Sequence, residues 1–112
     1  MGHLKLKDMA KVTQAQITQW KKQWGGVYSI EVPLDDNAKE KAVGYFKKPT
    51  LDTIKASSKY IESDPIKAGE VVFNNCWLGG DAEIKDNDEV KMSAMQQVSS
   101  LFKVRQATLK KL

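Results

Sequence analysis

Few side chains in this sequence could perform chemistry, and each lacks the neighbours that such chemistry would need. His3 is the only histidine and Cys76 the only cysteine among 112 residues. A histidine-dependent mechanism needs positioned partner groups, and a single cysteine rules out an internal disulfide or a multi-thiolate metal site. A reactive thiol needs a basic or helix N-terminal setting, whereas Cys76 ends an apolar helical stretch and is expected to be buried. We therefore predict no catalytic residues and no enzyme activity.

The acidic segment from Asp81 to Asp88 is a candidate for a metal site. An EF-hand loop needs glycine at its sixth position and glutamate at its twelfth, but counting from Asp81 these positions hold Asp86 and Met92. The preceding Gly79-Gly80 is not a phosphate loop, because no lysine followed by serine or threonine comes after it. We expect a solvated loop that favours the start of the next helix, with no metal and no cofactor, although weak cation binding stays open.

The large aromatic side chains are the residues most costly to leave in water, and the simplest interpretation places them in the core. The alternative is that some line a partner groove, because Trp and Tyr dominate interface hot spots and a small domain cannot cover every side chain. Trp20, Trp24, Tyr45 and Trp77 are therefore the candidate partner-binding residues.

The composition is that of one soluble globular domain with a mild positive charge. Eighteen Lys and Arg stand against fourteen Asp and Glu, which gives a net charge of +4. Arg105 is the only arginine, and nucleic-acid readers rely on the bidentate arginine fork, so nucleic acid is an unlikely partner. No apolar run is long enough to cross a bilayer and no secretory signal is recognisable. We expect no membrane association and a cytoplasmic location.

The first half of the chain predicts a helix followed by a hairpin. The helix starts at Thr13, where Gln16 completes a capping-box pattern, and ends at Gly25-Gly26. Alternating residues predict strands over 27–32 and 42–47, which most simply pair as an antiparallel hairpin. Two strands alone are marginally stable, so helices must cover one face or a second subunit must extend the sheet.

Three helices are predicted after the hairpin. Thr50 caps the first; the second has Asp64 as its cap and Pro65 at its first position, and Gly79-Gly80 closes it. Asp88 is expected to cap the last helix, and the basic tail over 104–112 is compatible with its continuation. The expected apolar faces are Leu51, Ile54, Ser58 and Ile61; Ile66, Gly69, Phe73 and Cys76 or Trp77; and Val90, Ala94, Val98 and Leu101.

These elements predict an α+β fold, a short antiparallel β-hairpin with a mostly helical remainder in the order α-β-β-α-α-α. Residues 1–12 are expected to form a flexible N-terminal arm, part of which vector sequence could supply. Residues 13–112 are expected to form a single α+β domain.

Several segments of the chain together resemble a known family. They are residues 17–25 (ITQWKKQWG), 45–49 (YFKKP), 75–84 (NCWLGGDAEI) and 107–112 (ATLKKL). In this order they resemble the small tail assembly chaperone-like proteins of phage and prophage tail modules. The similarity covers most of the chain from Lys11 onward and lies in the order and spacing of several short motifs.

The resemblance implies a non-enzymatic, protein-binding role in the cytoplasm of a bacterial host cell. Such chaperones bind the tape-measure and tail tube proteins, keep the tape-measure protein soluble and leave before the virion is complete. The family supplies no catalytic residues. A homo-oligomer is possible, and the alternative function is that of a small basic nucleic-acid-binding regulatory protein.

Overall fold

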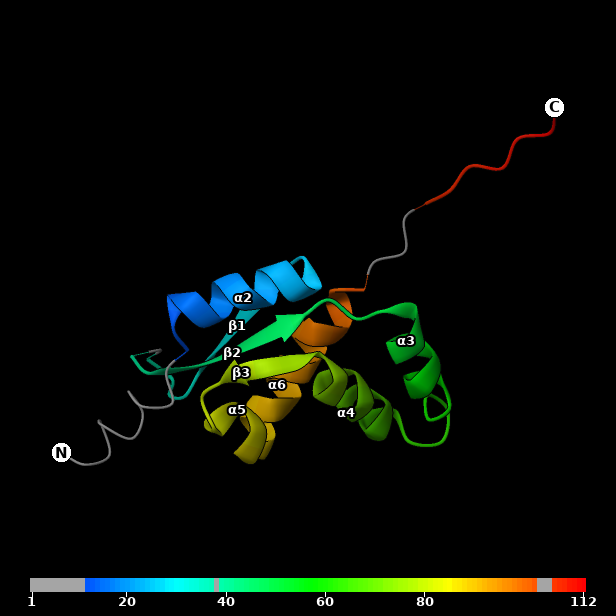
Figure 1. Cartoon of the computed structure of the whole chain (residues 1–112). Helices are drawn as coiled ribbons and strands as arrows, with labels where there is room; N and C mark the ends of the chain where they lie inside the picture. The colour runs from blue at the N-terminus through cyan, green and yellow to red at the C-terminus, as the bar shows by residue number, and fades with distance from the viewer. Residues whose placement is uncertain (1–11, 38, 103–105) are drawn as a thin grey trace.

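The computed structural model describes residues 12–37, 39–102 and 106–112, and in it helices lie on both faces of a three-stranded antiparallel sheet (Figure 1). The predicted α+β class, mostly helical with a short hairpin, is confirmed. The predicted arm over 1–12, except Val12, lies outside the described residues. The elements are α2 (Gln14–Trp24), β1 (Val27–Pro33), β2 (Lys41–Lys47), α3 (Leu51–Ser58), α4 (Pro65–Cys76), β3 (Trp77–Gly80), α5 (Glu83–Asp86) and α6 (Asp88–Ser100).

The hairpin of β1 and β2 sets which side chains face the core. Ile30 pairs with Gly44 and Val32 pairs with Ala42 in the antiparallel register, and all four residues are buried. Because successive side chains of a strand point to opposite faces, Tyr45 lies on the other face of the sheet. The predicted pairing of the two strands is therefore confirmed, and it separates an inner face from an outer face.

The hydrophobic core lies between the inner face of the sheet and the helices α4, α5 and α6. The largest fully buried side chains are Phe46, Phe73, Ile84, Val98 and Cys76. The rings of Phe46 and Phe73 meet edge to face, with their centroids 5.3 Å apart. This arrangement stabilises the fold beyond the free energy gained by burying the two side chains. Among the described elements, α2 alone covers the outer face of the sheet (Figure 1), and none of its residues is buried.

The strand β3 replaces the end of a predicted helix. We expected Gly79-Gly80 to close that helix, but α4 ends at Cys76 and the next four residues form β3, in which Trp77, Gly79 and Gly80 pair with β2. Gly80 has φ of +141° and lies so close to β2 that a Cβ atom would overlap the carbonyl oxygen of Val43. The two glycines therefore permit a close approach between strands, a role that local sequence does not distinguish from a helix end.

The end of β3 is fastened to β2 by Asp81. The N–H of Asp81 donates to the carbonyl oxygen of Val43 at 2.9 Å, and the N–H of Val43 donates to Oδ2 of Asp81, also at 2.9 Å. The segment after Asp81 is not only a solvated acidic loop, because it contains the short helix α5, whose Ile84 is fully buried.

Most of the predicted helix starts are confirmed. Thr13 and Gln16 form both hydrogen bonds of a capping box, Thr50 caps α3, and Asp64 accepts from the N–H of Lys67. The cap of α6 was predicted one residue too late. Asn87, not Asp88, accepts hydrogen bonds from the first free N–H groups of that helix, and an Asx side chain at this position satisfies donors that the helix cannot.

The apolar face predicted over 51–61 was wrong at three of its four positions. Leu51, Ser58 and Ile61 are exposed, whereas Thr53 and Ser57 are the buried residues of α3. The hydroxyl of Ser57 donates to the carbonyl oxygen of Ile54 at 2.9 Å, which allows this polar side chain to be buried.

The C-terminal segment does not continue α6 as a helix: α6 ends at Ser100, and residues 106–112 are neither helix nor strand.

Candidate partner-binding surfaces

Trp77 belongs to the core and lies apart from the other candidate aromatic residues. Its ring centroid is 5.5 Å from that of Phe46 and 5.8 Å from that of Phe73. Lys85 covers the ring from outside, with Nζ 5.4 Å from its centroid. The side chain is half-buried, and its contacts are internal to the domain.

Trp20 and Tyr45 come together on the outer face of the sheet, and Trp24 follows one turn later on α2, beside Lys47 of β2. We call these three aromatic residues the aromatic strip. The centroids of Trp20 and Tyr45 are 6.1 Å apart. A Cβ atom on Gly79 would lie 2.9 Å from the ring of Trp20, so the missing side chain of Gly79 leaves room for that ring. These contacts hold α2 against the sheet.

Trp24 is the most exposed member of the aromatic strip, with 44% of its surface accessible. Nζ of Lys47 lies 3.7 Å from the centroid of its ring, within the range of a cation–π interaction. The structure thus brings three of the four candidate residues together, and Trp24 is the member that could still contact a partner.

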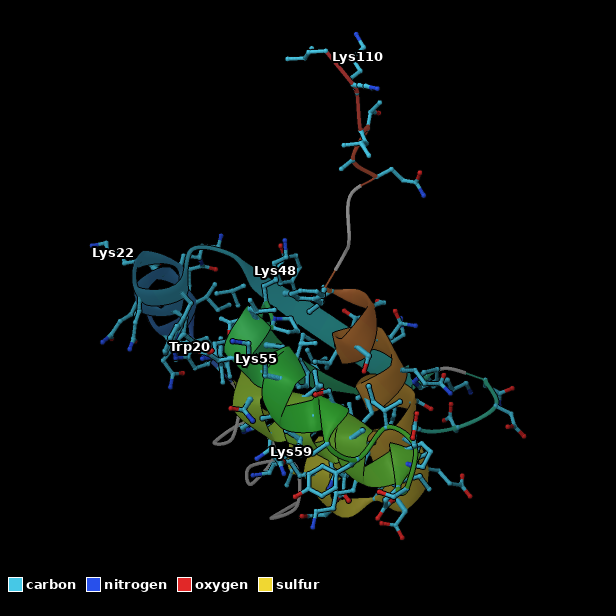
Figure 2. The ribbon with its side chains drawn as sticks, turned by 90° about the vertical axis from the view of Figure 1, so that its right-hand side faces the viewer. Trp20, Lys22, Lys48, Lys55, Lys59 and Lys110 are labelled. Atoms are coloured by element: carbon cyan, nitrogen blue, oxygen red, sulfur yellow. The ribbon has the colours of Figure 1, made fainter. Side chains whose placement is uncertain are left out.

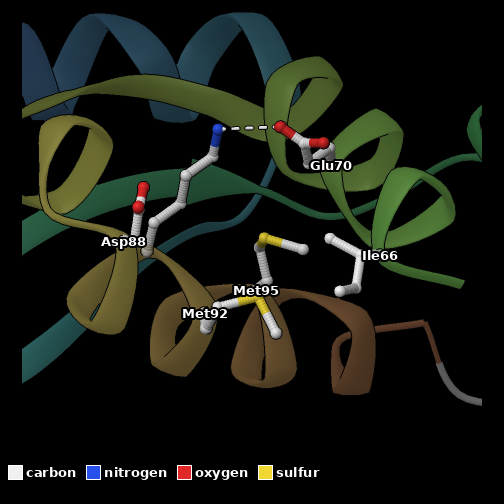
Figure 3. Close-up of a pocket in the computed structure, with 6 residues that line it drawn as sticks. Ile66, Glu70, Asp88, Met92 and Met95 are labelled. Atoms are coloured by element: carbon white, nitrogen blue, oxygen red, sulfur yellow. Dashed lines mark hydrogen bonds and ion pairs between the residues drawn. The ribbon is translucent and has the colours of Figure 1, made fainter.

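A second surface, which we call the α4/α6 groove, was not predicted. It runs between α4 and α6 as two adjoining hollows of about 240 and 250 Å³, and Figure 3 shows the first of them. Met95 lies at its base and is almost fully buried, whereas Ile66 and Met92 are 55% and 40% exposed on its sides. Methionine side chains adapt their shape to varied apolar ligands, so the groove suits an apolar partner.

The α4/α6 groove is widened by a small residue and has a charged end. Gly69 lies in its wall, and a Cβ atom there would lie 2.6 Å from Cε of Met95. At the other end, Nζ of Lys91 lies 3.0 Å from Oε2 of Glu70 and forms an ion pair and hydrogen bond with it, with Asp88 beside them (Figure 3). Two carboxylates and one ammonium therefore give this end a net negative charge.

One sequence signal could have indicated the groove. Met92 and Met95 are three residues apart, so they form an apolar stripe beside the buried face of Val90, Ala94 and Val98. From the sequence we expected only the face of Val90, Ala94 and Val98 to be apolar, and we did not expect Met92 and Met95 to form a surface of their own. We also expected Ile66 in the core, whereas that residue is exposed.

Cys76 is buried, as predicted. Its side chain has no exposed surface, and burial raises the pKa of the thiol from 9.0 to about 11, while nearby Lys47 opposes this shift. A thiol with a raised pKa is almost entirely protonated near neutral pH and is a poor nucleophile. His3, the other candidate for chemistry, lies outside the described residues.

Lysines line the side of the molecule formed by α2, the end of β2 and α3. Figure 2 labels Lys22, Lys48, Lys55 and Lys59 along this side, and all four are exposed.

Within residues 12–37, 39–102 and 106–112, no three His, Cys, Asp or Glu side chains gather closely enough to hold a metal ion. None of the described helices combines the length and apolarity that a membrane crossing requires.

Neither a protein-family model nor a curated protein matches this chain. Among solved structures, the chain is similar to an uncharacterised protein from Bacillus stearothermophilus, with a TM-score of 0.55 and 19% sequence identity. The match covers 84% of this chain and 98% of that one. At this level of identity, the two proteins are shown to share a fold and nothing further.

Proposed function

We propose that this chain is a non-enzymatic binding module that holds an amphipathic helix of a partner protein in the α4/α6 groove. The observation that carries the proposal is the groove itself, in which Ile66 and Met92 are exposed above Met95. A paired-helix groove of this kind is a recurring receptor for the apolar face of a helix. The resemblance to tail assembly chaperones supports the tape-measure protein as the client, with the tail tube protein as a second partner.

The dimensions of the groove fit a short helical segment. Its lining extends along α6 from Asp88 to Ser99, which corresponds to about 16 Å at 1.5 Å per residue. About three turns of a client helix could lie along it and present apolar side chains at spacings of three and four. A basic residue at one end of that helix would lie near Glu70 and Asp88.

The exposed apolar area argues for a weak, reversible interaction. Complete burial of an apolar side chain such as Ile66 or Met92 gains about 1.5–3 kcal/mol, and both are already partly covered. Association costs at least about 4 kcal/mol in lost freedom of motion. These two side chains alone do not offset that cost, so apolar side chains of the client must bury surface as well. The small balance corresponds to a transient complex, which suits a chaperone that leaves its client before assembly is complete.

Co-expression with the tape-measure protein of the same locus tests the proposal. The wild-type chain should raise the soluble fraction of that client, and Met92→Glu should remove the gain because it places a charge in the groove. Gln97→Glu is the matched control, since Gln97 is exposed on the same helix and does not line the groove. No gain in client solubility with the wild-type chain would refute the proposal.

Nucleic acid is the second candidate partner, favoured by one observation. The exposed lysines 22, 48, 55 and 59 share one side (Figure 2), and α2 contains no acidic residue. Binding through lysines alone would be sequence-independent and would weaken steeply with salt. The absence of any DNA or RNA mobility shift at low salt would remove this candidate.

A further inference from the structure

The net positive charge of the chain is located at its C-terminal end. Residues 101–112 (LFKVRQATLKKL) contain four basic residues and no acidic one. Removing these four from the eighteen Lys and Arg leaves fourteen, which equals the fourteen Asp and Glu of the rest of the chain. Residues 1–100 are therefore neutral as a whole, and the basic terminal segment accounts for the net charge of +4.

The described part of this segment also exposes apolar side chains. Leu109 is 98% exposed and Leu112 is fully exposed, and Figure 1 shows the C-terminal end standing away from the body of the molecule. We call residues 106–112 the tail. If the tail became helical, its two leucines, three positions apart, would lie on one face, with Lys110 and Lys111 between them in sequence.

The α4/α6 groove has the complementary character. Ile66 and Met92 offer apolar surface along its length, and Glu70 and Asp88 outnumber Lys91 at its charged end. The tail offers two leucines and two lysines. Because each chain carries both surfaces, two copies can bind one another through unlike patches.

We infer that the tail of one copy binds the α4/α6 groove of a second copy, with Leu109 and Leu112 against Ile66 and Met92. Lys110 and Lys111 then lie near the acidic end. The second copy is favoured over the chain's own groove because the tail leads away from the body (Figure 1). The contact is head-to-tail, so its repetition gives rings or open chains of subunits. This self-association uses the groove of the proposed function but needs no foreign client.

Sedimentation of the full chain over a range of concentrations tests the inference. The wild-type chain should form dimers and larger species, and more of them at low salt than at high salt. Leu109→Ser/Leu112→Ser should weaken association by roughly tenfold or more. The matched control Gln106→Ser/Thr108→Ser, in the same exposed tail, should associate like the wild type. A wild-type chain that stays monomeric, or equal behaviour of both double variants, would overturn the inference.

A mixing experiment distinguishes binding between copies from binding within one copy. The tail variant Leu109→Ser/Leu112→Ser keeps its groove, and Met92→Glu keeps its tail, so an equimolar mixture should form a one-to-one complex although each alone is monomeric. Ile66→Ser serves as the groove variant if Met92→Glu fails to fold by circular dichroism. No complex in the mixture would overturn binding in trans.

The proposed function can fail separately from this inference. Client solubilisation by Leu109→Ser/Leu112→Ser should be at least that of the wild type, because its groove is intact and no tail competes with the client for it. Self-association without any effect on the client would refute the proposed function alone. An effect on the client by a wild-type chain that never associates would refute the self-association alone.

Discussion

Replacement of Gly80 by alanine should destabilise the fold by about 3 kcal/mol. Gly80 has φ of +141°, and an added Cβ would overlap the carbonyl oxygen of Val43 on the neighbouring strand. Strain at such a backbone conformation costs about 1–3 kcal/mol. The displaced carbonyl also accepts the N–H of Asp81, whose carboxylate accepts the N–H of Val43, and each lost hydrogen bond adds about 1 kcal/mol.

Thermal unfolding followed by circular dichroism measures this effect. A loss of about 3 kcal/mol should lower the Tm by about 12–24 °C in a domain of this size. Gly69→Ala is the matched control, because alanine lowers the entropy of the unfolded chain equally in both variants. At Gly69 the new methyl group meets only the flexible end of Met95, at 2.6 Å, and alanine favours the helix by about 1 kcal/mol.

The two glycine variants should therefore differ widely in Tm, with Gly69→Ala close to the wild type. Equal Tm values would refute the reasoning, because they would mean that the close approach of β3 to β2 imposes no constraint. A large fall in the Tm of Gly69→Ala alone would also contradict the reasoning. It would mean that the space beside Gly69, and not the backbone contact of Gly80, is the constrained one.

Two further predictions concern the aromatic residues and the thiol. Trp77→Ala should cost about 3–5 kcal/mol in urea denaturation because it opens the core, whereas Trp24→Ala should cost about 1 kcal/mol or less; similar losses would contradict the assignment of Trp77 to the core. Because the pKa of Cys76 rises from 9.0 to about 11 on folding, the unfolded state loses the thiol proton first, so stability falls as pH rises between these values. Cys76→Ala should remove this part of the pH dependence, and an unchanged dependence in that variant would refute it.

Local sequence signals predicted the helix starts and the hairpin well. The hydrogen bonds of the caps at Thr13, Thr50 and Asp64 form within one turn of the chain, so residue type and spacing are enough to recognise them. The alternation over β1 and β2 also matches the observed burial. Such features depend little on the rest of the fold.

The signals that failed depend on contacts distant in sequence. The helical periodicity through Phe73 and Cys76 continues to Trp77, and only the pairing of Gly79 and Gly80 with β2 turns that segment into a strand. The α4/α6 groove was missed for the same reason, since it exists only where Ile66 and Met92 meet across two helices. Three of the four predicted aromatic residues lie on one face of the sheet. The sequence did not indicate that Trp77 lies elsewhere, because its stacking on Phe73 depends on the tertiary fold.

The fit between Trp20 and Gly79 has an evolutionary consequence. No residue of α2 is buried, so most outward positions of that helix can change among homologous chains with little loss of stability. Gly79 cannot change so freely, because any side chain there would meet the ring of Trp20. In homologues, a smaller residue at position 20 should therefore accompany a larger one at position 79, and the two positions should covary although 58 residues separate them in the chain.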